Sequence, residues 1–480
     1  MSVDNRLSRR AFLRAALGAG LGAGAVARSL RVGAQHNALN ASTKPGRVGI
    51  VGGGLAGLTV AYLLNKSGVD CEILEGSERL GGRVWTQSGF NAENMFAEMG
   101  AEYVAARDTS VLALARELAV GVQELTVGAG ENAYFIEGTL HSEKEASAAL
   151  KGFSTRLIKA RAEGSAKWDA RSVRAFLESA KADSDAWLLQ AIDIAYRNRS
   201  GLTTEGQSAM NLLSRLEVDG NRLHLFGKGD RFARIRGGSM ELLNALFTRI
   251  EGKVPLLLGQ KLVAIKQKSN SVQLGFNGGG GQTSEKIYAR VVLTLPFSTL
   301  REVAGLKALG LSAGKLRLIQ DLGYGAHLKT IYSFTEKPWL KRAALRDAQA
   351  SIVANGLVPL AWDSSFGQVG KMAVLSTLRM GLPATEVPLK EEMERMFPGS
   401  DAAFDPTSRA TADWVRPPWS RGSYACAKPG QFRARAASAG LAELGGRLHF
   451  AGEHASGESP ASMNGAVESA TRVVAALLKR

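Results

Sequence analysis

The chain has 480 residues, 45% of them hydrophobic and 22% charged, which is a globular composition and excludes intrinsic disorder. No apolar run reaches the roughly 18 residues that a membrane-spanning helix needs, so a multi-pass membrane protein is excluded. Cys71 and Cys426 are the two cysteines, and no His/Cys cluster has zinc spacing, so we expect neither a disulfide framework nor a metal site. The net charge of +16 falls to +11 beyond residue 34, with the basic residues scattered among acidic ones, so we expect no nucleic-acid partner.

Two adjacent arginines near the N-terminus lie in the run Ser8–Arg14 and precede a weakly apolar stretch rich in Ala and Gly, residues 15–27. This arrangement resembles a twin-arginine export signal. It predicts a signal peptide over residues 1–34, a linker over 35–43, and export of the folded protein to the periplasm or the extracellular space by the twin-arginine machinery. The alternative is a short amphipathic helix, which the glycines in the apolar stretch disfavour.

A glycine-rich turn separates the first predicted strand from a predicted helix. The strand covers residues 47–51, the helix covers 59–64, and the glycines between them have G-x-G-x-x-G spacing at Gly52, Gly54 and Gly57. In this pattern the first glycine permits the turn, the second lets the backbone approach a diphosphate, and the third lets the helix pack on the strand. The helix N-terminus then faces the phosphates. The pattern therefore predicts a dinucleotide-binding turn of the Rossmann type.

A second predicted strand, residues 70–74, ends in Glu75, about 20 residues after the glycines, where a carboxylate can bind the ribose hydroxyls of a dinucleotide. The run Leu74–Val84, with its glycine pair and arginine, resembles the flavin-containing amine oxidase family. That family includes monoamine, polyamine and L-amino-acid oxidases and flavin-dependent histone demethylases. The resemblance implies FAD as the cofactor, with Gly82 and Arg83 at its diphosphate, where a guanidinium suits bidentate binding.

Further segments extend the resemblance over most of the chain after the signal, and each implies a contact with FAD. Gly100, in the run Glu98–Tyr103, would pass beneath the isoalloxazine ring. The backbone of Val263 would meet the adenine, and Glu453 would bind the ribityl or phosphate region. Met463 would open the last helix, whose N-terminal amides can stabilise the negative charge of reduced flavin.

The resemblance also implies the fold class, which is α/β, with a Rossmann-like FAD-binding domain and an inserted α+β substrate-binding domain. The FAD-binding domain is expected over residues 44–101, 232–298 and 421–480. The substrate domain is expected over residues 102–231 and 299–420.

Hydrophobic periodicity supports this division. Residues 111–180 and 186–216 have helical periodicity, whereas residues 256–296 indicate strands around a hairpin turn at Gly278–Gly281. The G-x-S-x-G pattern around Ser312 is that of hydrolase nucleophiles, but the segment around it is polar and helical. We therefore interpret Ser312 as a helix cap.

The segment 323–332 matches the family stretch whose lysine reaches flavin N5 through a water, which implies that Lys329 is the catalytic residue. Its expected role is to place that water and to assist flavin reoxidation or proton movement. A lysine is costly to bury in a mostly apolar strand, and this favours a functional reason for its presence. The alternative is a lysine at a strand end that extends its charged head to solvent.

The expected substrate cavity is aromatic on one side. Trp414 and Tyr424 lie in segments that resemble those bringing aromatic side chains to the flavin, and Tyr424 would form one wall of an amine cage. The facing tyrosine of monoamine oxidases is matched here by Ser462, which would leave that side open. Tyr103 occupies the place where several L-amino-acid oxidases have an arginine that binds the substrate carboxylate. Ser423 occupies the place of the cysteine that some monoamine oxidases bond to flavin, which implies noncovalent FAD.

Together these features predict an FAD-dependent amine oxidase that converts a C–N bond to an imine, then hydrolysed to a carbonyl compound and ammonia or an amine. Dioxygen, giving hydrogen peroxide, or another acceptor would reoxidise the flavin. Because Tyr103 stands in the place of that arginine and Ser462 leaves one side of the cage open, we expect a small-molecule amine without an α-carboxylate and with a bulky or extended substituent. One alternative is an L-amino-acid oxidase in which Arg107 or another arginine binds the carboxylate. Carotenoid desaturases and porphyrinogen oxidases share the N-terminal fingerprint, and a flavoprotein that binds envelope components without turnover is an alternative of a different class.

Overall fold

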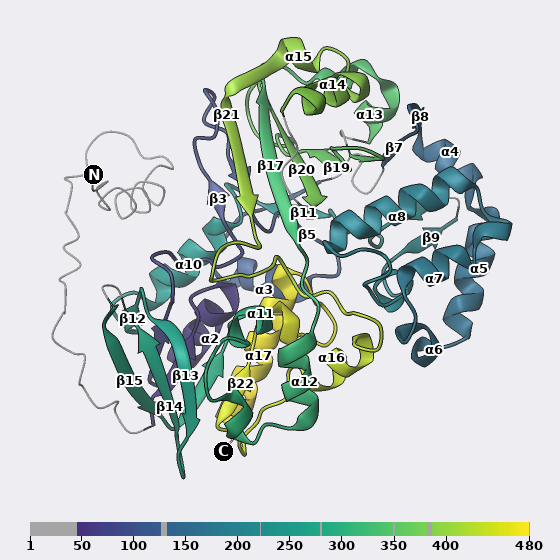
Figure 1. The fold of residues 1–480 in the computed structure, drawn as a ribbon. Helices are drawn as coiled ribbons and strands as arrows, with labels where there is room; N and C mark the ends of the chain where they lie inside the picture. The colour runs from purple at the N-terminus through teal and green to yellow at the C-terminus, as the bar shows by residue number, and fades with distance from the viewer. Residues whose placement is uncertain are drawn as a thin grey trace.

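The computed structural model describes residues 46–125, 132–220, 222–278, 281–348, 351–381 and 386–479. The expected signal peptide and linker lie outside these residues. Figure 1 shows two bodies, one built on a parallel sheet and the other on a long mixed sheet, with α17 (Met463–Leu478) in the first. Within the described residues, no helix combines the length and the apolar character that crossing a membrane requires.

A five-stranded parallel sheet forms the centre of the first body. Its strand order is β12-β2-β1-β16-β22, and every neighbouring pair is parallel. The strands are Leu256–Leu257, Cys71–Leu74, Val48–Val51, Arg290–Leu293 and Leu448–Phe450, in sheet order. They come from three distant parts of the chain, and β1 and β2 are buried along their whole length. The Rossmann-like module predicted from the strand, turn and helix pattern is confirmed.

Helices cover one face of this sheet and an antiparallel sheet covers the other. The helices are α2 (Leu55–Lys66), α10 (Met240–Ile250) and α17, which share one hydrophobic core. The antiparallel sheet comprises β13 (Lys261–Gln267), β14 (Val272–Asn277) and β15 (Thr283–Tyr288). Asn277 pairs with Thr283, so the hairpin expected at the glycine run is confirmed.

The hydrophobic cores divide the chain differently from the expected domains at two places. Helix α3 (Thr109–Glu117) packs with α2 and α17, although residues from 102 onward were expected in the substrate domain. Helix α12 (Ala313–Asp321) packs against the other face of the parallel sheet, although residues from 299 onward were expected in the substrate domain. Ser312 caps α12 by accepting from Lys315 N, as expected. The apolar faces of these helices therefore complete the core of the first body.

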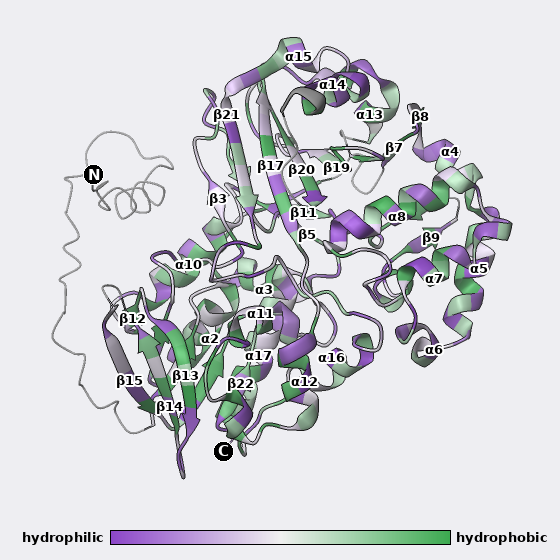
Figure 2. Cartoon of the chain, in the orientation of Figure 1, coloured by the Kyte–Doolittle hydropathy of each residue, from purple (hydrophilic) through white to green (hydrophobic). Residues whose placement is uncertain are grey.

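A seven-stranded mixed sheet forms the second body, in the order β21-β17-β20-β19-β18-β7-β8. Its strands are Phe404–Asp413, His327–Phe334, Ala373–Met380, Leu360–Asp363, Ile352–Ala354, Ala133–Ile136 and Thr139–His141. Helix α8 (Ala186–Ser200) packs on β18, β19 and β20, and shorter helices surround it. These are α4 (Glu143–Ala148), α5 (Leu150–Ala162), α6 (Ser165–Asp169), α7 (Val173–Glu178) and α9 (Met210–Leu213). In Figure 2 the outer helices α5 and α12 mix purple and green residues, as helices with one buried face do.

The helical prediction for residues 111–180 is wrong in its middle part. Strands β6 (Val122–Glu124), β7 and β8 lie between α3 and α4. Strand β7 pairs in parallel with β18, more than 200 residues later in the chain. Pairing between distant segments decides the conformation here, and local periodicity does not report it.

Candidate active site

One cavity of about 940 Å³ is lined by residues of both bodies. All the predicted site residues except Gly57 line it: Gly52, Gly54, Glu75, Gly82, Arg83, Gly100, Tyr103, Val263, Lys329, Trp414, Tyr424, Glu453, Ser462 and Met463. This volume is within the range of small-molecule and cofactor sites. The fold therefore brings together residues that lie more than 400 positions apart in the chain.

The three fingerprint glycines meet three different requirements. Gly52 has φ +112°, and a Cβ there would lie 2.3 Å from Thr294 Oγ1. A Cβ at Gly57 would lie 1.9 Å from the Gly52 carbonyl oxygen, which explains why Gly57 supports the packing of α2 and does not line the cavity. Gly54 has φ −79°, and a Cβ there would have no neighbour nearer than 3.8 Å. Since no side chain caps α2, its first N–H groups remain for a ligand, and a diphosphate fits this turn.

Replacing Gly54 by valine is expected to preserve the fold and abolish flavin binding, because the added methyl groups would enter the space that a diphosphate needs. The matched control is Gly314→Val, because Gly314 lies outside the cavity on the exposed first turn of α12, with its nearest neighbour 3.6 Å from a Cβ. Flavin absorbance per chain and far-ultraviolet circular dichroism measure the two effects. Normal flavin content in folded Gly54→Val would contradict the phosphate-site interpretation.

The Glu75 end of the cavity is ordered by hydrogen bonds. Glu75 Oε2 accepts from Gly53 N at 2.6 Å, and Oε1 accepts from Ser77 N at 2.8 Å and Ser77 Oγ at 2.7 Å. Val263 lies in a β-bulge of β13, and its carbonyl oxygen accepts from Ala304 N at 2.8 Å. The Trp419 ring lies against Gly76, so this tryptophan is at the Glu75 end.

An ion pair between Arg83 and Glu453 forms part of the cavity wall. Arg83 Nη1 donates to Glu453 Oε1 at 2.6 Å and to the Ser423 carbonyl oxygen at 2.8 Å. The Glu453 carboxylate also accepts from Ala425 N and Ala461 N. Burial alone would raise the pKa of Glu453, but the charge of Arg83 and the hydrogen bonds from Arg83 and Ala461 together lower it. Glu453 therefore orients Arg83 and the loops that contain Ala425 and Ala461. The sequence predicted only a cofactor contact for Glu453 and did not indicate this function.

Met463 is the first residue of α17, as predicted. Ser462 precedes it as the N-cap, and its Oγ accepts from Gly465 N at 3.0 Å and donates to the Ser459 carbonyl oxygen at 2.8 Å. Ser462 lines the cavity, but its hydroxyl is used to begin the helix. Its presence is thus explained by capping, independently of any open cage.

Lys329 lies in β17, between β20 and β21, and its side chain is 5% exposed. Its Nζ donates to Glu102 Oε2 at 2.8 Å and to the Gly100 carbonyl oxygen at 3.3 Å. The alternative interpretation, a lysine that extends to solvent, is therefore wrong. The pair fixes the lysine head at the cavity wall next to Gly100.

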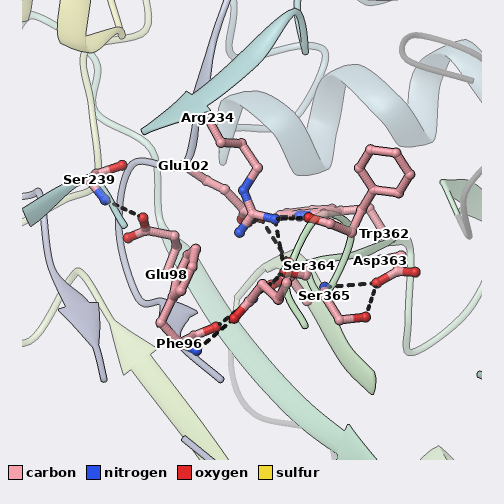
Figure 3. Close-up of polar contacts among 12 residues, drawn as sticks. Phe96, Glu98, Glu102, Arg234, Ser239, Trp362, Asp363, Ser364 and Ser365 are labelled. Atoms are coloured by element: carbon pink, nitrogen blue, oxygen red, sulfur yellow. Dashed lines mark hydrogen bonds and ion pairs between the residues drawn. The ribbon is translucent and has the colours of Figure 1, made fainter. Parts of the chain in front are cut away.

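Glu102 is the centre of a buried polar network that the sequence did not reveal (Figure 3). Besides Lys329, its carboxylate contacts Arg234 Nη2 at 3.3 Å, Trp362 Nε1 at 3.0 Å and Ser364 Oγ at 2.9 Å. Burial alone would raise the pKa of Glu102, but the charges of Lys329 and Arg234 lower it. Glu102 lies in the run Glu98–Tyr103, where the sequence indicates no role for it, and Arg234 lies outside every sequence motif. The network keeps a carboxylate ionised beside the proposed catalytic lysine.

The aromatic wall is held by hydrogen bonds to its polar atoms. Trp414 Nε1 donates to the Met99 carbonyl oxygen at 3.2 Å, and the Tyr424 hydroxyl donates to the Arg199 carbonyl oxygen. The Tyr424 ring lies 5.0 Å from the ring of His327. Both predicted aromatic residues therefore reach the cavity with fixed orientations.

His327 is a neutral member of this wall. Burial lowers its pKa to about 4. Its Nε2 is 2.7 Å from the Asn198 carbonyl oxygen, which only accepts, so Nε2 carries the proton. Nδ1 therefore accepts from Ser423 Oγ at 2.5 Å. The Ser423 hydroxyl is thus hydrogen-bonded to His327.

Comparisons with known proteins agree with this geometry. The profile of the family described as flavin containing amine oxidoreductase matches residues 55–478. The chain is 27% identical to the flavin-dependent L-tryptophan oxidase RebO of Lentzea aerocolonigenes, over 90% of this chain and 98% of that protein. It is also 27% identical to nicotine dehydrogenase of Pseudomonas putida, over 88% and 86%. The fold matches putrescine oxidase bound to putrescine with a TM-score of 0.73 at 17% identity, over 91% of this chain and 100% of that one.

Proposed function

The chain belongs to the flavin-containing amine oxidoreductase family, and we propose that it binds FAD noncovalently and oxidises an amine at the carbon that bears the nitrogen. The observation that carries this proposal is that one cavity is lined both by the Gly52–Gly57 turn, through Gly52 and Gly54, and by Lys329. The turn suits a diphosphate, whereas Lys329, Trp414 and Tyr424 suit a flavin ring and an amine.

Noncovalent binding is supported by Ser423. A serine hydroxyl cannot form the thioether that a cysteine forms, and this one already donates to His327. FAD should therefore be released intact when the protein is denatured, with none of the flavin absorbance remaining on the precipitated chain.

In the proposed reaction, a primary amine, dioxygen and water give a carbonyl compound, ammonia and hydrogen peroxide. Bound FAD would supply the chemistry by accepting two electrons from the amine and passing them to the oxidant. The chain contributes orientation and a dry site: Tyr424 and Trp414 pack beside the amine and exclude water. Lys329, held by Glu102, positions a water for proton transfer at the flavin edge.

The test is anaerobic mixing of the purified protein with a panel of amines and amino acids, followed by addition of dioxygen. Bleaching of the flavin spectrum by at least one compound, and peroxide formation on reoxidation, are expected. A flavoprotein that only binds envelope components would keep its oxidised spectrum with every compound, and that result would overturn the enzymatic proposal.

We also propose export through the twin-arginine pathway. Support comes from the sequence Ser8–Arg14 alone, which lies outside the described residues. The double variant Arg9→Lys, Arg10→Lys is expected to accumulate in the cytoplasm, because this pathway requires the arginine pair. Undiminished export of that variant would reject the assignment.

A further inference from the structure

Three arginines, Arg107, Arg199 and Arg215, line the cavity and are called the arginine cluster below. In the described ranges of the chain, none of them forms an ion pair with a carboxylate. Neutral groups position them instead: Arg107 Nη2 donates to the Phe226 carbonyl oxygen at 3.3 Å, and the Arg199 guanidinium lies 5.0 Å from the centre of the Phe226 ring. Each guanidinium has five N–H donors, so most of these donors remain available to a ligand.

The cluster concentrates positive charge in a confined place. Arg215 Nη2 donates to the Pro460 carbonyl oxygen at 2.7 Å. Burial lowers the pKa of Arg215, and the positive charges of Arg199 and Arg107 lower it further. Like charges that share a site destabilise one another, and an anion bound between them removes that cost.

Acidic residues line the same cavity as well, among them Asp108, Glu217 and Asp230, and Asp108 interacts electrostatically with Arg107 and Arg215. Asp108 Oδ2 accepts from Ala105 N at 2.9 Å and Glu217 Oε2 accepts from Lys228 N at 3.2 Å, and none of the three carboxylates forms an ion pair with the cluster among the described residues. The guanidinium donors of the cluster are therefore not taken up by ion pairs with these carboxylates.

The cluster lies next to the wall where the amine is proposed to bind. The carbonyl oxygen of Arg199 accepts the Tyr424 hydroxyl hydrogen bond, and the Tyr424 ring packs beside His327. His327 lies two residues before Lys329 in β17. A substrate whose amine lies at Tyr424 thus has the guanidinium groups within reach of a neighbouring substituent.

We propose that the arginine cluster binds a carboxylate of the substrate, so that the enzyme oxidises an amine that also bears a carboxylate, in the simplest case an amino acid. This inference rests on the proposed function. It replaces the expectation drawn from Tyr103, because the tertiary structure supplies arginines from three other segments of the chain. Arg234 does not compete for this role, since it is paired with Glu102.

The test compares matched substrates with and without the carboxylate: L-tryptophan with tryptamine, L-phenylalanine with phenethylamine, and L-lysine with cadaverine. The rate of anaerobic flavin reduction is measured for each. We expect at least one amino acid to reduce the flavin faster than its decarboxylated partner. Arg199→Met and Arg215→Met should each lower kcat/KM for that amino acid by about 10- to 100-fold and leave the decarboxylated partner within about twofold.

The matched control is Arg197→Met, because Arg197 lies on the same helix α8 but outside the cavity lining. It removes the same charge and should leave both substrates unchanged. A second measurement uses benzoate, a carboxylate without an amine, whose binding is followed through the flavin spectrum and compared with benzyl alcohol. Benzoate should bind to the parent protein and to Arg197→Met, and at least tenfold more weakly to the two cavity variants.

Faster reduction by the decarboxylated partners, or equal benzoate binding in all variants, would overturn the carboxylate assignment and leave the amine oxidase proposal intact. If no compound of any pair reduces the flavin, the proposed function fails. Benzoate binding then decides separately whether the arginine cluster is an anion site.

Discussion

Replacing Glu102 by glutamine is expected to lower the free energy of unfolding by about 3–5 kcal/mol, because Lys329 and Arg234 would then both remain buried without a counter-charge. Glu102 is the carboxylate that both contact, at 2.8 Å and 3.3 Å. Urea denaturation of the flavin-containing protein, followed by tryptophan fluorescence, measures the change. The double variant Glu102→Gln, Lys329→Met should lose less than the sum of the two single losses, because it removes one of the stranded charges.

Glu98 provides the matched control for this experiment. It is also fully buried, but burial raises its pKa to about 7, and its carboxylate accepts from Ser239 N and Thr86 Oγ1. Glutamine resembles a protonated glutamate, so Glu98→Gln should cost about 1 kcal/mol at neutral pH. Equal losses for the two variants would show that the charge of Glu102 is not what stabilises the network.

Replacing Lys329 by methionine is expected to slow flavin reduction or reoxidation by about 10- to 1000-fold, which corresponds to about 1.4–4 kcal/mol of lost transition-state stabilisation. An apolar side chain of similar length fills the space but cannot hold a water or move a proton. Stopped-flow half-reactions per bound flavin give the rates independently of any loss of folded protein. Rates equal to those of the parent enzyme would remove Lys329 from the mechanism.

Lys315 provides the control for a buried lysine without a catalytic position. Its side chain is fully buried, it donates to the carbonyl oxygens of Ala439 and Leu441, and it does not line the cavity. Burial lowers its pKa to about 7. Lys315→Met is therefore expected to change stability while leaving both flavin half-reactions within about twofold.

The cofactor end of the site follows closely from short segments of sequence. The turn Gly52–Gly57 is a local strand, turn and helix, and Gly57 is required by the carbonyl oxygen of Gly52, five residues earlier. The last helix begins at Met463 as expected, because a capping serine and a regular apolar stripe are adjacent in the chain. The capping role of Ser462 could also have been predicted from local sequence, because a serine directly before an apolar helix is a typical N-cap.

One feature of the fold could not be obtained from local sequence. Strands β6 and β7 form because β6 pairs with β11 (Ala233–Ile235) and β7 pairs with β18, and the local periodicity did not indicate this. Where strand partners come from distant segments, pairing and burial outweigh local preference.

The sequence by itself determined the family, the dinucleotide turn and the position of the proposed catalytic lysine, because each depends on residues close together in the chain. The tertiary structure alone decided what surrounds that lysine and what charge the cavity presents. Glu102, Arg234 and Lys329 come from three separate segments, as do Arg107, Arg199 and Arg215. The charge state of a group in a protein interior depends on its neighbours and on its burial, and both are determined by folding.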